Sequence, residues 1–507
     1  DRIEDGKTKK DILGYMETAV NMLDLRQKYT DKFYESVDEA NGYLENEFYD
    51  GYCGDFEAIV SGVGHTHIDV AWLWPLDVTR MKTIHSFTTV LRLMEEYPEY
   101  LFMSSQPQLY DFIKNDRPDI YEKIKDRIAE GQWEPEGGMW LEADCNLASG
   151  ESFVRQLLFG TRFFKSEFDA DCKVLWLPDV FGYSAALPQI LRKSGVEYFM
   201  TTKIFWNEYN RFPYETFTWE GIDGSTVLSH FITATDTRNT IRTYGSTYNG
   251  RLSTAHVKGS WDNYSQKDIN NDVLMSFGYG DGGGGPTREM MEEGRRLSKA
   301  VPGCPKYEMT KSRDFFERLE ERVGDNPRLP KWVGELYLEY HRGTYTSVGK
   351  NKWFNRKCEL LLRDVELFSQ IAASYGISPY KRELINANWE TVLLNQFHDI
   401  LPGSSIMEVY EESQEQYEGV MESLGKILEE TTTKIAYAAA VGEDKCVVFN
   451  QLSHIRYDIA KVEVNKEYTH AIGPDGECTA GQMIEEDGIK YFIFVAKVQP
   501  MGYSVYS

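Results

Sequence analysis

Between residues 58 and 280 the chain alternates short apolar segments with longer amphipathic ones. The apolar segments have the length of buried strands, and the amphipathic segments repeat their apolar residues at helical spacing. The pattern predicts strands at 58–63, 100–104, 173–177, 197–202 and 273–277, and helices at 78–96, 119–130 and 187–193. Buried strands that alternate with helices indicate an α/β fold with a mostly parallel sheet, either open or closed into a barrel. Because ligands bind at the carboxyl ends of strands in such sheets, polar residues that follow a strand are candidates for a site.

Different patterns flank this region. Residues 8–47 repeat apolar positions at helical spacing. From about 349 to 440 three helical segments are separated by turn residues, which suggests a three-helix bundle. After Gly442 the sequence alternates in the manner of strands, as at the start of a β-sandwich. The predicted parts are a helical segment at 1–57, an α/β catalytic domain at 58–345, the bundle at 346–440 and a partial β domain at 441–507.

The composition of the chain limits the kinds of molecule that the protein can bind. At 507 residues the chain is too long for one hydrophobic core. A net charge of −25 argues against binding to nucleic acid or to an anionic membrane, because both require basic surfaces. No apolar run approaches the roughly 20 residues of a membrane span, and the polar N-terminus bears no signal peptide. Seven scattered cysteines, an odd number, indicate reduced thiols of a cytoplasmic protein.

The segment GHTHIDVAW (64–72) follows the first predicted strand and carries three potential metal ligands. His65, His67 and Asp69 alternate along the chain, so an extended segment points all three side chains the same way. Imidazole and carboxylate are good zinc donors, and catalytic zinc typically takes three protein ligands. A hydrogen-bonded histidine pair is the structural alternative. The spacing favours a metal site, in which one histidine could instead orient another group.

Two further motifs place an aspartate after a predicted strand. In WLPDVFGYS (176–184) this residue is Asp179, for which an Asx turn or a helix cap is the alternative. In GYGDGGGG (278–285) Asp281 precedes four glycines, whose loop suits close approach by a bulky polar ligand. A phosphate-binding loop is the rival, but no Lys-Ser/Thr pair follows the glycines.

Three other segments allow two interpretations each. In NQFHDILPGSS (395–405), His398 and Asp399 end a predicted helix, where a histidine is usually a structural cap but could complete a site. The stretch ELYLEYHRGTYTS (335–347), with His341 and Tyr345, suits either sugar recognition or an ordinary turn surface. The stretch QWEPEGGMWLEADCN (132–146) reads as a carbohydrate-lined rim or as a solvated loop.

In this order and at these separations, GHTHIDVAW, WLPDVFGYS, FGYGDGGGG and NQFHDILPGSS resemble glycoside hydrolase family 38, the α-mannosidases. The variants HIDVAW, GDGGGG and ELYLEYHRGTYTS look like the cytosolic and bacterial branch of that family. The likeness runs from about residue 58 to the end of the chain. It implies a seven-stranded (β/α) barrel, a three-helix bundle and β domains, of which this chain looks like the central part.

The resemblance also implies one zinc ion (Zn2+) per chain. The residues that match its ligands are His67, Asp69, Asp179 and His398. In that pattern His65 becomes a pocket residue. His398 changes from a helix cap to a ligand supplied by the bundle, which would lock two domains together.

The mechanism that the family implies is that of a retaining glycosidase acting on a terminal α-mannoside. Asp179 matches the nucleophile, and we predict that Asp281 is the acid/base, because it alone in its loop can donate a proton to the leaving oxygen. The metal would grip the mannose 2- and 3-hydroxyls rather than generate hydroxide. The predicted substrate contacts are Trp72, which would stack on the sugar, Asp399, His65, His341 and Tyr345.

Two rival functions remain at this point. A metal-dependent polysaccharide deacetylase or amidohydrolase shares histidine and aspartate ligands but activates a water molecule. A sugar-binding protein without catalysis would need neither of the two aspartates 179 and 281. The linkage, the aglycone and homo-oligomerisation are not fixed by the sequence.

Overall fold

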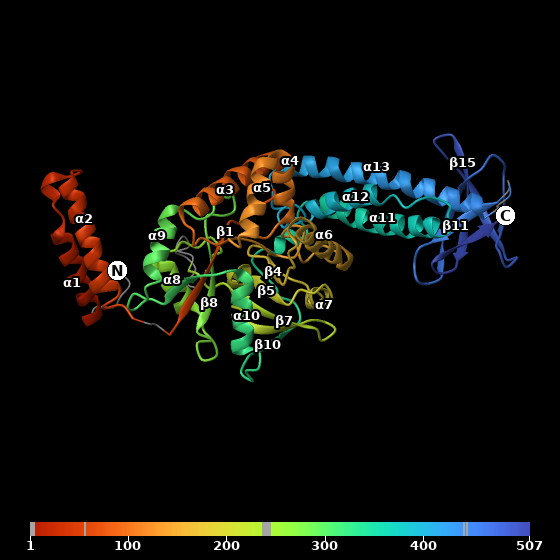
Figure 1. Ribbon diagram of the computed structural model, residues 1–507. Helices are drawn as coiled ribbons and strands as arrows, with labels where there is room; N and C mark the ends of the chain where they lie inside the picture. The colour runs from red at the N-terminus through yellow and green to blue at the C-terminus, as the bar shows by residue number, and fades with distance from the viewer. Residues whose placement is uncertain (1–5, 55–56, 236–244, 440–441, 443–444) are drawn as a thin grey trace. The chain divides into compact units, whose positions relative to one another are not determined.

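The computed structural model describes residues 6–54, 57–235, 245–439, 442 and 445–507, and these residues form two compact units (Figure 1). The first unit comprises residues 1–355 together with 393–414. The second comprises residues 356–392 together with 415–507. The chain therefore leaves the first unit and returns to it for about twenty residues before it completes the second.

A five-stranded parallel sheet is built around the first predicted strand. Its strands are β1 (Ile59–His65), β2 (Phe102–Ser104), β3 (Trp133–Pro135), β8 (Asp272–Phe277) and β9 (Lys306–Met309), in the order β3-β2-β1-β8 with β9 also paired to β1. All these pairs are parallel, and Val60 lies opposite Val273 in the register of β1 and β8. The alternation of apolar and amphipathic segments thus correctly predicted a parallel core.

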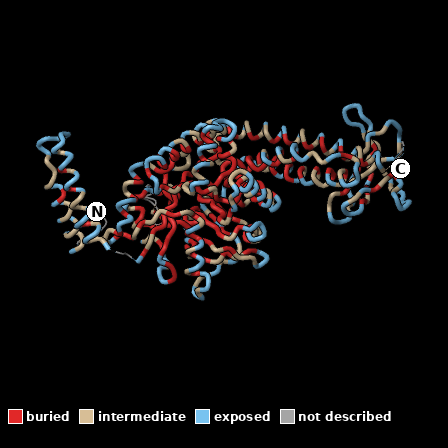
Figure 2. The backbone as a smooth tube through the Cα atoms, in the orientation of Figure 1, coloured by how far each residue is buried: buried red, intermediate tan, exposed pale blue. Residues whose placement is uncertain are grey.

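The second sheet of this unit also has five strands. In spatial order they are β10 (Lys331–Val333), β6 (Thr216–Glu220), β7 (Thr226–Phe231), β5 (Tyr198–Thr201) and β4 (Val174–Trp176). Strand β4 pairs in parallel with β5, and β5 with β7, whereas β6 and β7 form an antiparallel pair. Figure 2 shows that buried residues concentrate along the strands of this unit.

The closed seven-stranded barrel that the resemblance implies is not formed by the described strands, so this expectation is corrected. The ladder of strand pairs is interrupted between β3 of the first sheet and β4 of the second. Strand β3 ends at Pro135, which has no N–H for a further ladder bond, and only the isolated bridge between Gly137 and Leu175 follows. Gly137 has φ +139°, and a Cβ atom there would lie 2.6 Å from the Ser105 carbonyl oxygen. The ladder therefore breaks into two sheets.

Helices surround these sheets, and several begin where the sequence predicts. Pro118 is the first residue of α5, where its missing N–H costs no hydrogen bond. Ser149 caps α6 by accepting from the Ser152 N–H. The helical segments of this unit are α1 (Lys7–Met22), η1 (Leu25–Gln27), α2 (Asp31–Tyr43), η2 (Leu44–Tyr49), α3 (Leu76–Glu96), α4 (Pro107–Asp116), α5 (Pro118–Ala129), α6 (Gly150–Phe168), α7 (Leu187–Lys193), η3 (Lys203–Trp206), α8 (Thr254–Asn263), α9 (Arg288–Leu297), α10 (Ser312–Val323) and η4 (Arg342–Tyr345).

The second unit contains most of three long helices and an antiparallel β region. The helices are α11 (Gly349–Ser374), α12 (Arg382–Asn395) and α13 (Met407–Ala438). Trp389 of α12 donates to Glu366 of α11, and Asn388 donates to Ser423 of α13. The strands are β11 (Cys446–Asn450), β12 (Arg456–Glu463), β13 (His470–Ile472), β14 (Cys478–Glu486), β15 (Ile489–Val498) and β16 (Gly502–Tyr506). They form a four-stranded sheet, β12-β15-β14-β13, and the pair β11-β16.

In the part of the chain that is described, no helix has the length and apolarity needed to cross a membrane.

A buried acid after β3 makes the stability of the first unit depend on pH. Oε1 of Glu136 accepts hydrogen bonds from the backbone N–H groups of Gly137, Lys173 and Val174. Burial, and then the nearby Glu134 carboxylate, raise the pKa of Glu136 from 4.5 to about 8. The folded state therefore holds a proton that the unfolded state loses above about pH 4.5, so this residue costs stability progressively from about pH 4.5 to 8.

We expect Glu136→Gln to stabilise the protein at pH 8.5 and to change little at pH 5. The glutamine keeps the acceptor oxygen and removes the ionisation, and each pKa unit is worth about 1.4 kcal/mol. Thermal unfolding of both proteins from pH 5 to 9 should show a difference in Tm that grows with pH to several degrees. Glu95→Gln, a change at an exposed position of α3, serves as the control. A difference in Tm independent of pH would contradict the buried ionisation.

Candidate metal centre

The segment that follows β1 is held in place by the glycine-rich loop. Ile68 forms an antiparallel bridge with Gly282, and the Asp69 N–H donates to the carbonyl of Asp281 at 2.9 Å. The backbone after β1 thus continues in an extended form beyond the sheet, as the alternation of polar residues predicts. This pairing also brings the backbone of Asp281 next to that of Asp69.

His65, the first histidine of the motif, has protein partners at both ring nitrogens. Its Nδ1 lies 3.0 Å from the Met103 carbonyl, and its Nε2 accepts from the Trp176 indole at 3.4 Å. Burial lowers the pKa of His65 to about 4. Both ring nitrogens are therefore engaged by the protein, and the contact of His65 with substrate stays a prediction.

Four buried residues converge beyond the strand ends. His67, Asp69, Asp179 and His398 each bring one potential ligand atom to within 4.8 Å of the others. Nε2 of His67 lies 2.8 Å from Asp69 Oδ1 and 3.8 Å from Asp179 Oδ2. Nε2 of His398 lies 3.5 Å from Asp69 Oδ1 and 3.8 Å from Asp179 Oδ2. The four predicted ligands are thus brought together, and all four belong to the first unit.

The charges in this cluster depend on one another. Burial by itself lowers the pKa of His398, but Asp179 and Asp69 outweigh it and raise that pKa to about 10. Burial by itself raises the pKa of Asp179, but Lys203 and the two histidines hold that pKa below its usual value. The pKa of His67 is likewise raised, because Glu142 and Asp69 outweigh the effect of burial. Without a metal, the cluster balances its carboxylates with protons on both imidazoles.

This arrangement fits a divalent cation. Nε2 of His398 is buried and has no hydrogen-bond partner among the described residues, although oxygens of three carboxylates lie within 4 Å of it. Two imidazoles and two carboxylates form a donor set that zinc accepts. A cation bound here would replace the two imidazole protons, since metal ligation requires neutral histidine.

Lys203, which the sequence analysis did not single out, lies against Asp179. It is the first residue of η3, two positions after β5, and its side chain is only 7% exposed. The ammonium donates to Asp179 Oδ1 and lies 3.9 Å from the centre of the Trp206 ring. One carboxylate oxygen of Asp179 is therefore held by Lys203, while the other faces the two histidines.

Asp281 occupies a restricted position in the glycine-rich loop. Its φ is +62°, in the left-handed region that aspartate tolerates better than most residues. Tyr248 Oη donates to Asp281 Oδ1 at 2.8 Å, and Asn249 Nδ2 donates to the same oxygen at 3.0 Å. The Tyr248 ring lies 5.1 Å from the ring of His67, so this tyrosine stands between the cluster and Asp281.

The remaining predicted contacts lie beside the cluster. Oδ2 of the buried Asp399 lies 3.9 Å from His398 Nε2, and Ser404 donates to Oδ1. Burial, and then the Asp69 carboxylate, raise the pKa of Asp399 to about 7. Trp72 is half-buried, and its carbonyl accepts from the Ile406 N–H in the loop that follows Asp399.

His341 and Tyr345 lie in the partly exposed stretch 335–347. The His341 ring is 4.7 Å from that of Phe181, which in turn is 6.0 Å from that of His398. Tyr345 ends the short helix η4 and is half-buried. These positions agree with the edge of a site rather than with its centre.

The stretch 132–146 contradicts both interpretations made from sequence. Its two tryptophans and four acidic residues are all buried, so it is neither a solvated loop nor an exposed carbohydrate rim. Glu142 lies in the middle of this stretch, and its Oε2 is 3.0 Å from Nδ1 of His67. Its carbonyl accepts from Nδ1 of His398 at 2.7 Å. Periodicity cannot reveal such a residue, because its burial arises only when β1, β3 and residues 393–414 meet.

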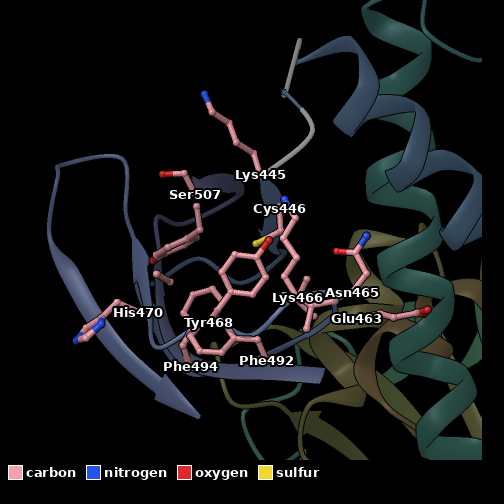
Figure 3. A pocket seen from close by; sticks show the side chains of 14 residues that line it. Lys445, Cys446, Glu463, Asn465, Lys466, Tyr468, His470, Phe492, Phe494 and Ser507 are labelled. Atoms are coloured by element: carbon pink, nitrogen blue, oxygen red, sulfur yellow. The ribbon is translucent and has the colours of Figure 1, made fainter. Parts of the chain in front are cut away.

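One cavity lies in the second unit. It measures about 570 Å3 and is lined by aromatic and polar residues of the β region, among them Tyr468, Phe492 and Phe494 (Figure 3). The four converging histidines and aspartates belong to the first unit instead.

Comparison with known proteins agrees with these motifs. Residues 57–335 match the model of the glycosyl hydrolases family 38 N-terminal domain, and residues 339–435 match that of the alpha mannosidase middle domain. The chain is 41% identical over 391 residues to alpha-mannosidase G of Dictyostelium discoideum, which covers 77% of this chain and 34% of that protein. It is 40% identical over 417 residues to human alpha-mannosidase 2C1, covering 82% and 39% respectively.

A solved structure shares the fold. An alpha-mannosidase from Enterococcus faecalis superposes with a TM-score of 0.72 at 20% identity, over 89% of this chain and 56% of that one. The chain spans between a third and two fifths of the length of the two curated relatives described above.

Proposed function

This chain belongs to glycosyl hydrolase family 38, and we propose that it is a zinc-dependent retaining α-mannosidase that removes terminal α-linked mannose. The observation that carries the proposal is the buried cluster of His67, Asp69, Asp179 and His398. A third aspartate, Asp281, is joined to it because its carbonyl accepts from the Asp69 N–H. These four residues would hold one zinc ion.

Zinc bound here would act as a Lewis acid that grips two neighbouring sugar hydroxyls and favours the distorted ring of the transition state. The remaining roles fall to side chains. Asp179 is the nucleophile, which attacks the anomeric carbon and forms a covalent mannosyl-aspartate. Lys203 keeps this carboxylate ionised and fixes its orientation through Oδ1.

Asp281 is the acid/base in this proposal. Both of its hydrogen-bond donors, Tyr248 and Asn249, bind Oδ1. A proton destined for the leaving oxygen is therefore carried by Oδ2, and the same oxygen later takes a proton from the attacking water. The two donors fix the orientation of the carboxyl group.

The sugar would be recognised by residues that surround the cluster. Trp72 provides an apolar ring face for stacking, and Asp399 accepts a hydroxyl. His341 and Tyr345 contact the part of the substrate that extends outward, since both lie in the partly exposed stretch 335–347. We propose a cytoplasmic location and an oligosaccharide or simple glycoside as substrate. The net charge of −25 supports neither nucleic acid nor an anionic membrane as partner.

The rival is a metal-dependent deacetylase with a metal-activated water. One observation weighs against it. The Lys203 ammonium donates a hydrogen bond to Asp179 and lowers the pKa of this carboxylate, which makes it a weak base toward water. A carboxylate of low pKa suits a nucleophile better than a general base.

We expect the protein to hydrolyse 4-nitrophenyl α-mannoside, to lose at least about 90% of this activity after dialysis against a chelator, and to regain it with stoichiometric zinc. The release of nitrophenol measures the activity, and atomic absorption measures the metal. The matching β-mannoside should not be hydrolysed. Release of acetate from an acetylated oligosaccharide by the zinc-loaded protein, without hydrolysis of the α-mannoside, would replace this proposal by the rival.

A further inference from the structure

Glu142 is buried in an unusual way for an acid in the middle of a loop segment. It lies between β3 and α6 and is 1% exposed. A buried carboxylate is costly unless partners replace its hydration. Oε1 accepts from the Ser105 hydroxyl at 3.1 Å. Oε2 forms an ion pair with His67 at 3.0 Å from Nδ1, and neither of these two atoms has a hydrogen-bond partner among the described residues.

The same residue reaches the second histidine of the cluster through its backbone. The carbonyl of Glu142 lies 2.7 Å from His398 Nδ1 and also accepts from the His398 N–H at 3.3 Å. Next to Glu142, Ala143 forms an antiparallel bridge with Phe397, and the Asp144 N–H donates to the Gln396 carbonyl. The segment that contains Glu142 is therefore paired with the segment that delivers His398.

These contacts determine which nitrogen of each ring faces the cluster. The Glu142 carbonyl only accepts, so Nδ1 of His398 carries a proton, and the negative carboxylate 3.0 Å from Nδ1 of His67 favours a proton on that nitrogen too. In a neutral imidazole the lone pair is then on Nε2. In both rings Nε2 is the atom that approaches Asp69 and Asp179. One residue thus presents the same nitrogen of both histidines to the same point.

We propose that Glu142 is a positioning residue of the metal centre, which fixes the tautomer and orientation of His67 through its carboxylate and of His398 through its carbonyl. This inference rests on the proposed function, because it assumes that the cluster binds zinc. A histidine that ligates a metal commonly donates its other ring N–H to a carboxylate or a backbone carbonyl, and loss of such a partner costs about 10- to 100-fold in metal affinity. Here a single residue supplies both kinds of partner.

The two contacts can be separated by substitution. Glu142→Gln removes the negative charge opposite His67 but leaves the backbone carbonyl that contacts His398. We expect this variant to bind zinc about 10- to 100-fold more weakly than the unchanged protein, measured by competition with a chelating dye. Glu136→Gln, a change of another buried acid of the same segment that contacts neither histidine, should leave the zinc affinity within about twofold. Ser105→Ala, which removes the other partner of the carboxylate, should also change it little.

A second measurement needs no variant. In the zinc-loaded native protein, the nitrogen chemical shifts of the His67 and His398 rings should show a protonated Nδ1 and a metal-bound Nε2. A His67 ring that is protonated at Nε2 would overturn the proposal, as would Glu142→Gln binding zinc as tightly as the native protein. If the native protein binds no zinc at all, the proposed metal dependence fails together with this inference. If it binds one zinc that Glu142→Gln does not weaken, only the role of Glu142 fails.

Discussion

Replacing Asp179 by asparagine is expected to lower kcat on an α-mannoside by about 10,000-fold or more, because covalent catalysis loses its nucleophile. The amide has nearly the shape of the carboxylate, and its carbonyl oxygen can still face the two histidines. Because Asp179 is also a proposed ligand and the partner of the buried Lys203, zinc affinity and Tm should fall as well, so activity is compared at saturating zinc, with one zinc per chain confirmed in both proteins. Steady-state hydrolysis of 4-nitrophenyl α-mannoside, together with metal analysis of the same sample, measures both effects.

A matched variant separates the two roles of Asp179. Asp69→Asn removes a carboxylate of the cluster that is not the proposed nucleophile, and its loss of activity should be partly recovered with excess zinc. The loss in Asp179→Asn should not be recovered. A fluorinated mannosyl donor that forms the intermediate faster than water releases it should label Asp179 in the native protein, as detected by peptide mass spectrometry. Label on another residue would refute the assignment.

The second large effect is expected at Asp281. With alanine at this position, kcat/KM for a mannoside with an alkyl leaving group should fall by about 100- to 10,000-fold, the usual range for loss of a general acid. For 4-nitrophenyl α-mannoside kcat/KM should fall by less than about tenfold, because nitrophenolate leaves without a proton. The measurement is kcat/KM on both substrates, since this ratio reports the first bond-breaking step.

The control for this prediction is Asp268→Asn, which changes an exposed aspartate paired with Arg328 in the same unit and should affect neither substrate. Added azide should accelerate the alanine variant on the nitrophenyl substrate, since a small anion needs no base to attack the mannosyl-aspartate. Equal losses of kcat/KM on both substrates would exclude Asp281 as the acid and indicate that it only positions the backbone of Asp69.

Most of the candidate site residues can be predicted from the sequence because each follows a predicted strand. His67 and Asp69 follow β1, Asp179 follows β4 and Asp281 follows β8, and such ends meet at one edge of a parallel arrangement. Lys203 likewise follows β5, but a single lysine after a strand carries no metal-ligand pattern in the sequence. A lysine at a strand end is a candidate whenever a carboxylate follows the neighbouring strand.

Other residues could not be found from local pattern. The local sequence alone predicts that His398 is a helix cap. The family resemblance predicts instead that it is a ligand, and the structure places it in the cluster. Glu142 lies in a stretch whose acids and tryptophans suggested an exposed surface, but tertiary packing buries all of them. The closed barrel failed for a similar reason, because single residues such as Pro135 and Gly137 decide whether a ladder continues.

The return of the chain to its first unit has a consequence for biosynthesis. His67, Asp69 and Asp179 leave the ribosome before His398, which follows Asp179 after roughly 220 residues. At about 5–20 residues per second this interval lasts on the order of ten to forty seconds. Throughout it, the nascent chain carries three of the four ligand side chains of the cluster. The zinc site that we propose could be completed only after residues 356–392, which belong to the other unit, have been synthesised. Under that proposal, metal capture would follow the synthesis of most of this unit.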